Sequence, residues 1–157
     1  MFPISCIPHY SRSRIKLVGN DENGGTDEVG KNTVFYQGFY SVLSGSLTAI
    51  KIKTDNSGNV KVALYSNAAS NPGTVLTSSG STAVVPGWNT IPVTPYVVQS
   101  TFYWLAFNSD TQMVLNLTTT GMTDYYKSAT YSTFTFVSNP TGLTSFTTAN
   151  FQLGGWT

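Results

Sequence analysis

Histidine and cysteine are almost absent from this sequence. The chain of 157 residues contains one histidine, His9, and one cysteine, Cys6. A lone cysteine excludes an internal disulfide, and any Ser-His-Asp or Cys-His site would depend on His9 alone. No Gly-x-Ser-x-Gly sequence, phosphate-binding glycine loop or zinc-ligand spacing occurs. The carboxylates beyond residue 32 are Asp55, Asp110 and Asp124, too few to suggest a paired glycosidase site. The sequence therefore predicts that the protein is not an enzyme.

Charge is also scarce. Charged residues make up 10% of the chain and the net charge is +1, whereas serine and threonine supply 41 residues. A near-neutral chain has no general attraction to nucleic acid or anionic lipid, and no apolar run approaches the ~18 residues of a membrane span. Nucleic acid and membrane are therefore not expected as partners. A surface of hydroxyls and amides is typical of secreted, cell-surface and virion β-proteins, so we predict location on a virion or an extracellular surface.

The amino terminus does not resemble a signal peptide. Met1–Pro8 contains no basic residue, and Pro3 and Pro8 interrupt its apolar run. We therefore expect either a domain of a larger secreted protein or a virion protein that leaves the cell without secretion.

Helical periodicity is missing, and apolar residues instead alternate with polar ones. Leu47–Lys53 alternates with Ile50 and Ile52 on one face, as a half-buried strand does. Thr101–Phe107 is apolar on both faces, which is typical of a central strand that has both faces covered or uses one face for contact. Further strands are expected near residues 60–65, 75–79, 83–85, 88–93, 113–117, 134–137 and 151–156. The pattern predicts an all-β, antiparallel, jelly-roll-like β-sandwich of about eight to ten strands.

Two local features of the predicted sandwich depend on particular residues. The sequence 55–58 predicts a turn in which Gly58 adopts a positive φ. Trp88 and Trp104 follow the strand period, so we expect both in the core.

The first 32 residues read differently from the rest. Prolines, the Ser-Arg repeat and a polar cluster predict an irregular N-terminal arm over residues 1–32, in which 15–18 could form a short strand, followed by the sandwich over 33–157. Arg12, Arg14 and Lys16 form a small basic stripe at alternating positions. The stripe is too slight for nucleic acid, so we interpret it as a solvated edge or as an assembly contact with a homo-oligomeric or other virion partner.

One segment of the predicted sandwich resembles a known family. Val60–Asn108 contains V-K-V-A-L-Y-S-N, N-P-G-T-V-L, P-G-W-N-T-I-P-V and F-Y-W-L-A-F. These sequences resemble jelly-roll-like modules of bacterial and archaeal surface proteins and of phage structural proteins. The resemblance implies a sandwich fold and leaves the function open, because the family is a scaffold with many uses. The sequence departs from the family pattern at residues 99–102, where a glycine often precedes the Tyr-Trp pair.

An acidic segment near the amino terminus is a candidate metal site. Asp21, Asn23, Asp27 and Glu28 gather oxygen ligands around two glycines, which suits Ca²⁺. The spacing does not match an EF-hand loop, so a solvated acidic loop and a structural calcium site both remain open.

Aromatic residues in polar, loop-like sequence are candidate contact residues. Tyr125, Tyr126, Tyr131 and Trp156 each combine a flat apolar face with a polar group, which suits sugar stacking or a protein interface. The alternative is that they pack against the sheet of their own domain.

Two functions fit these observations. The first is a non-enzymatic structural or attachment protein of a phage-like virion, such as a decoration, tail or fibre subunit. The second is a carbohydrate-binding or adhesive module of an extracellular protein, with the four aromatic residues contacting glycans.

Overall fold

Alternation of apolar and polar residues gives this chain its strands. A computed structural model describes residues 14–20, 26–118, 123–147 and 150–157; for 26–27, 116–118 and 150 only the backbone is described. Within these ranges the chain forms sixteen strands and no helix. The predicted all-β antiparallel sandwich is confirmed, since every pairing among these strands is antiparallel.

The first sheet contains seven strands. They are β1 (Lys16–Gly19), β2 (Thr26–Val29), β5 (Ala49–Thr54), β9 (Gly87–Pro92), β12 (Met113–Thr118), β15 (Asn150–Phe151) and β16 (Leu153–Trp156). β5 lies at its centre and pairs with β9, β12 and β16.

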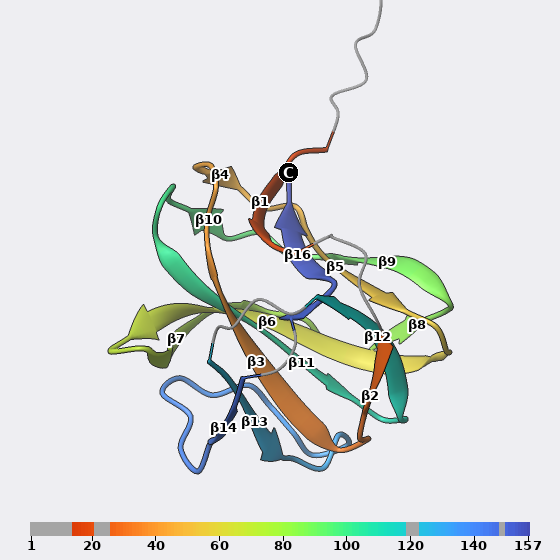
Figure 1. The fold of residues 1–157 in the computed structure, drawn as a ribbon. Helices are drawn as coiled ribbons and strands as arrows, with labels where there is room; N and C mark the ends of the chain where they lie inside the picture. The colour runs from red at the N-terminus through yellow and green to blue at the C-terminus, as the bar shows by residue number, and fades with distance from the viewer. Residues whose placement is uncertain (1–13, 21–25, 119–122, 148–149) are drawn as a thin grey trace, which may run out of the picture.

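The second sheet also contains seven strands, in the order β14-β13-β3-β11-β6-β7 with β8 beside β6. They are β3 (Thr33–Tyr40), β6 (Gly58–Ala68), β7 (Asn71–Ser78), β8 (Thr82–Val84), β11 (Phe102–Ser109), β13 (Asp124–Ser128) and β14 (Thr144–Phe146). Its long strands β3, β11 and β6 run side by side (Figure 1). A separate ribbon of β4 (Gly45–Ser46) and β10 (Tyr96–Val97) lies at one end of the sandwich.

The main core lies between the two sheets. Ile50 and Ile52 of β5 face Val62 and Leu64 of β6 across it, and all four are fully buried. Their polar neighbours Lys51 and Lys53 stay half-buried, so the predicted orientation of β5 is confirmed. Burial of such side chains, about 1.5–3 kcal/mol each, is the main source of stability in a chain whose only cysteine cannot form an internal disulfide.

A second core covers part of the outer face of the second sheet. Tyr36, Tyr65 and Ala106 point away from the main core and pack against Phe136. Phe136 belongs to the covering segment, residues 129–143, which contains no strand. β11 is therefore buried on both faces in its middle, and the predicted central position of this strand is confirmed.

Some predictions of individual elements are wrong. The predicted count of about eight to ten strands is too low, because the sheets contain several short strands. The strand expected over 151–156 is interrupted at Gln152. β15 pairs with β12, whereas β16 pairs with β1 and β5. Residues 134–137 form no strand, since Phe134 and Phe136 cap the second core from the covering segment. Trp88 is 44% exposed, because it lies on the outer side of β9.

Gly58 does not take a positive φ. A Cβ at this position would lie 2.2 Å from the Thr111 hydroxyl oxygen, so the glycine is explained by a close approach between two turns.

The irregular arm ends earlier than predicted. Residues 16–19 and 26–29 are strands of the first sheet, and Leu17 and Val18 are buried in the main core. The hydrophobic pair inserts because β1 runs beside β16, with Gly154 and Gly155 allowing close contact. The sandwich therefore includes residues that the sequence assigned to the arm, while residues 1–13 lie outside the described part of the chain.

Candidate functional site

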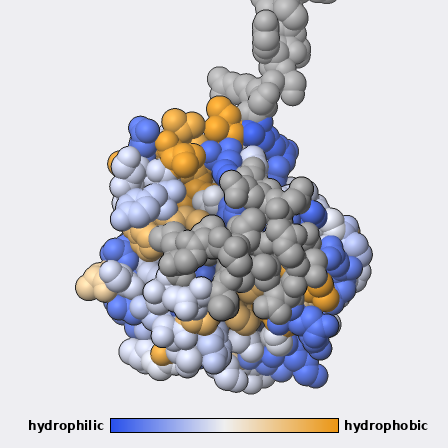
Figure 2. Space-filling model, viewed as in Figure 1, coloured by the Kyte–Doolittle hydropathy of each residue, from blue (hydrophilic) through white to orange (hydrophobic). Residues whose placement is uncertain are grey.

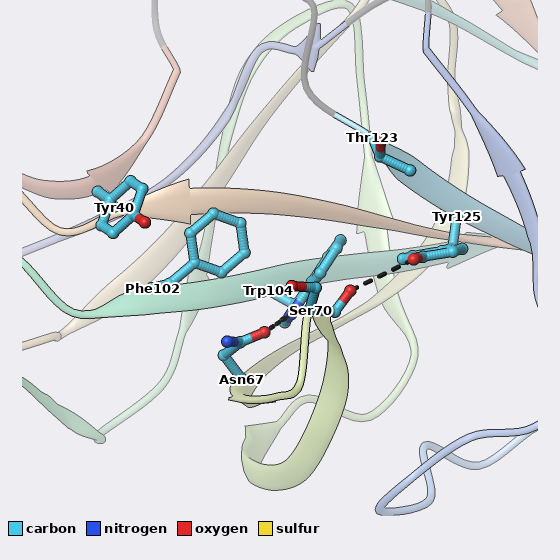
Figure 3. A pocket seen from close by; sticks show the side chains of 7 residues that line it. All are labelled: Tyr40, Asn67, Ser70, Phe102, Trp104, Thr123 and Tyr125. Atoms are coloured by element: carbon cyan, nitrogen blue, oxygen red, sulfur yellow. Dashed lines mark hydrogen bonds between the residues drawn. The ribbon is translucent and has the colours of Figure 1, made fainter.

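Four aromatic rings follow one another on the outer face of the second sheet, beyond the covering segment. They are those of Tyr40, Phe102, Trp104 and Tyr125, and Figure 3 shows them in a row across β3, β11 and β13. Successive ring centroids are 4.9, 5.3 and 5.3 Å apart. Trp104 is 2% exposed and forms the floor of the row, whereas Tyr40 is 62% exposed. The row is thus part core and part surface.

The rings line an open hollow of about 330 Å³. Asn67, Ser70 and Thr123 complete its wall and supply amide and hydroxyl groups. The Trp104 Nε1–H donates to Asn67 Oδ1 at 3.0 Å, which fixes the orientation of both side chains. The Asn67 Nδ2 group can donate hydrogen bonds to a bound molecule. A volume in the range of ~300–1,000 Å³ with a few fixed polar groups is typical of a small-molecule site.

Gly38 makes the row possible. A Cβ on Gly38 would lie 2.3 Å from Cζ of Phe102 and 3.3 Å from Cζ3 of Trp104, so the Phe102 ring lies directly over the backbone of β3. A glycine within a strand often marks such a close approach. Any larger residue would push Phe102 out of the row.

Asp124 supports the Gly38 backbone from the buried side of the second sheet. Its Oδ1 accepts from the Gly38 amide at 3.2 Å, and its Oδ2 has no hydrogen-bond partner in the described part of the chain. Burial raises the pKa of this carboxyl to about 7 from its ordinary value of 3.8, against opposing hydrogen bonds from the Gly38 amide and the Gln37 side chain. Gln37 in turn accepts from the Phe151 amide at 3.1 Å. The start of β13, and with it Tyr125, is therefore anchored to both sheets.

The β6–β7 hairpin closes one side of the hollow. Its tip residues Ala69 and Ser70 have φ values of 47° and 64°, the left-handed region that matches the twist of a tight hairpin but is unfavourable for residues other than glycine. The Ser70 carbonyl accepts from the Tyr125 hydroxyl at 3.3 Å. The strained tip and the aromatic row therefore position each other.

The structure separates the four aromatic residues predicted as contacts. Tyr125 lines the hollow, whereas Tyr126 points to the other face of β13 and stacks on Phe35 at 6.1 Å. Tyr131 is buried, and its hydroxyl donates to Ser81 at 2.6 Å. Trp156 lies on β16 of the first sheet beneath the Lys51 ammonium group. Tyr125 alone lines the hollow. Tyr131 packs within its own domain, whereas Tyr126 is 38% exposed and Trp156 is half-buried, so both combine packing with exposed surface.

Most of the predicted calcium and arm residues fall outside the part of the chain whose side chains are described. Asp21, Asn23 and Arg12 lie outside the described residues, and for Asp27 only the backbone in β2 is described. The Glu28 carboxylate accepts from the Gln112 side chain, Arg14 is exposed, and Lys16 lies in β1. No group of metal-ligating side chains occurs within the part of the chain that the structure describes.

Residue patterns in the sequence did not predict Tyr40, Asn67, Phe102 or Gly38 as part of the site. A signal was present, because Tyr36, Gly38 and Tyr40 share one face of a strand and a glycine between two tyrosines indicates a close approach. The sequence does not indicate that Trp104 and Tyr125 lie on the same sheet face as Gly38.

Two further observations bear on the identity of the protein. Among the described residues, no helix is long and apolar enough to span a membrane. Comparison with protein-family models, curated proteins and solved structures finds no match to this chain, so the resemblance of Val60–Asn108 to surface and phage modules stays a prediction.

Proposed function

We propose that this chain is a non-enzymatic attachment module that binds carbohydrate in the aromatic hollow of its second sheet. The observation that carries the proposal is the row of rings with an amide and hydroxyls around it. Sugar rings present apolar C–H faces and polar edges, and aromatic faces beside hydroxyl and amide groups complement both. Exposed aromatic residues on a rigid sheet also lose little conformational entropy on binding.

The chemistry of the wall favours binding over catalysis. The described lining residues offer hydrogen-bond donors and acceptors, and none is a nucleophile paired with a base. Asp124, the buried carboxyl nearby, lies behind Gly38 and is fully shielded from solvent. Its raised pKa is explained by that burial, and its hydrogen bond to the Gly38 amide gives it a supporting position.

The test is a glycan array probed with the full chain, followed by calorimetric titration of the sugars that bind. Tyr125→Ala removes a ring of the hollow, and we expect it to weaken binding by at least about tenfold. Tyr126→Ala is the matched control, because it removes the neighbouring ring on the opposite face of β13. We expect this control to lower stability but to leave the affinity unchanged.

Two outcomes would contradict the proposal. One is a full chain that binds no sugar on the array. The other is equal loss of affinity in Tyr125→Ala and Tyr126→Ala, which would place the contact elsewhere.

A second candidate function is assembly into a particle or surface layer. An apolar end patch is exposed next to the ribbon of β4 and β10, and Figure 2 shows it as an orange area at that end of the molecule. Its members are 42–53% exposed: Ile15, Val42, Leu43 and Val98. Contiguous exposed apolar surface commonly marks a protein contact. Ile15 directly precedes β1, so a contact at the patch would include the start of the first sheet.

Light scattering on the full chain and on Val42→Asp, Leu43→Asp tests this candidate. A defined oligomer that the double variant converts to monomer would support assembly through the end patch. Monomers in both samples would contradict it. A deletion of residues 1–13 is the suitable arm variant, because deletion of residues 1–32 would also remove β1 and β2.

A further inference from the structure

A second hollow adjoins the aromatic hollow. Its volume is about 440 Å³, and it lies where the ends of β6, β7 and β11 meet the ribbon strand β10. Leu76, Tyr96 and Thr101 line it. Tyr96 is 61% exposed, so its ring stands at the rim as a further stacking surface.

The two hollows share part of their walls. Phe102 and Asn67 line both of them. Phe102 is held against Gly38 on one side and contacts the rings of Tyr40 and Trp104 on the others, so this shared wall is rigid. A ligand that fills both hollows must extend over the shared wall, from Tyr125 on β13 to Tyr96 on β10.

None of the described residues that line either hollow carries a charge. Serine, threonine, asparagine and tyrosine groups provide all of the polar contacts there. A ligand rich in carboxylate or sulfate would be desolvated without an ionic partner, which is unfavourable. The walls therefore suit an uncharged ligand with many hydroxyl groups.

The rings do not form a flat platform. Successive planes in the row differ by 82°, 73° and 47°. A crystalline polysaccharide face needs coplanar rings, whereas a single chain can turn each sugar against a differently oriented ring. The geometry favours a separate chain over an ordered fibre surface.

From these observations we infer that the two hollows are consecutive subsites for one extended, neutral oligosaccharide chain. This inference rests on the proposed carbohydrate-binding function. It adds that the ligand is uncharged, is long enough to fill both hollows, and is a separate chain. The Tyr125 hollow binds one part of the chain, and the Tyr96 hollow binds sugars further along it.

Calorimetry with a homologous series tests the inference. The probes are neutral glucose, mannose, galactose and xylose oligomers, each from disaccharide to hexasaccharide, with oligogalacturonate and heparin fragments as acidic probes. For the neutral series that binds, we expect affinity to rise by about tenfold or more from disaccharide to hexasaccharide as the second subsite fills. We also expect that affinity to be nearly independent of salt.

Two variants separate the subsites. Tyr96→Ala is expected to abolish the gain from chain length while leaving disaccharide affinity unchanged, and Tyr125→Ala is expected to weaken every probe. Trp88→Ala is the matched control, since this exposed ring lies on β9 of the first sheet and lines neither hollow.

The outcomes distinguish the inference from the function on which it rests. Equal affinity for all neutral lengths, or tighter and salt-sensitive binding of the acidic probes, would overturn the extended neutral chain and leave carbohydrate binding standing. Unchanged length dependence in Tyr96→Ala would overturn the second subsite. Failure of every probe to bind would overturn both proposals.

Discussion

The outer face of the second sheet has a covered half and an open half that are built from the same strands. β3 places Val34 and Tyr36 under the covering segment and Tyr40 in the open half, and all three share one face. β11 likewise runs from half-buried Phe102 through Trp104 to buried Ala106. The two halves differ in what lies above them and not in their strand pattern. Aromatic residues thus become core or open surface according to a segment distant in sequence.

The largest expected effect comes from uncovering the covered half. Phe136→Ala removes the ring that packs on Tyr65 at 6.3 Å and on Phe134 at 4.9 Å. We expect a loss of about 3–5 kcal/mol in the free energy of unfolding, measured by urea denaturation, because a large buried ring leaves a cavity. Val137→Ala, a change at the exposed neighbouring position, should cost less than about 0.5 kcal/mol. Similar losses in both variants would contradict the existence of a second core.

The next effect is a pH dependence that arises at the edge of the open half. The folded pKa of Asp124 is about 7, above its ordinary value of 3.8, so between about pH 4 and pH 7 the folded chain holds a proton that the unfolded chain releases. The stabilisation by this group is therefore complete below about pH 4 and is lost as the pH rises to about 7. We expect a decrease of roughly 2–4 kcal/mol over this window.

Urea denaturation at a series of pH values, compared with Asp124→Asn, measures this contribution. The amide cannot ionise, so the variant should lack most of the decrease and should be more stable than the natural chain at pH 8. A variant with the same pH profile as the natural chain would show that Asp124 is charged in the folded state.

Overpacking the open half should have a smaller cost. Gly38→Ala places a methyl group in steric overlap with the Phe102 ring. We expect a loss of about 1–3 kcal/mol in the free energy of unfolding, together with weaker sugar binding. Phe102→Ala removes the obstacle, so the double variant should lose less than the sum of the two single variants, as measured in a double-mutant cycle. Additive losses would indicate that the two residues do not interact.

The smallest effect concerns the attachment of the covering segment. The Lys61 ammonium group donates to the Tyr131 and Phe134 carbonyls, both at 2.8 Å, and lies 4.6 Å from the centroid of the Tyr131 ring. Lys61→Met keeps the aliphatic stem and should cost about 1 kcal/mol, with faster hydrogen exchange confined to residues 129–143. Lys127→Met, which removes one exposed bond to the Thr141 carbonyl, should change the exchange less. Unchanged exchange in Lys61→Met would show that the two Lys61 bonds contribute nothing to holding the segment.

The sequence predicted the inner architecture well, because inward-facing residues follow a strict period of two. Ile50, Ile52, Val62 and Leu64 are buried as expected, and β11 is central because both of its faces are apolar. The pattern failed where burial does not depend on strand period. Phe134 and Phe136 alternate like a strand but are held from an irregular segment, and Trp88 alternates on the outer side of β9.

The candidate site was predicted only at Tyr125. Tyr125 and Tyr126 are adjacent in a strand and therefore point to opposite faces. Which of the two faces the open side depends on the pairing of Tyr125 with Tyr36. Likewise, Asn67 became a wall residue because β6 extends beyond the covering segment to its hairpin. Both facts are pairings between distant segments, which residue spacing within one strand does not encode.

The way in which the covering segment is held has an evolutionary consequence. Lys61, Lys127 and Asn108 reach the segment through main-chain carbonyls, and the Gly73 carbonyl of β7 accepts from the Asn139 amide. Because every residue type presents the same carbonyl, the exposed side chains between these anchor points are free to drift. Substitutions at exposed positions of the segment that make no such bond, such as Val137, could therefore accumulate without loss of the fold. A lineage carrying this domain could diversify its surface there while the sandwich beneath stays constant.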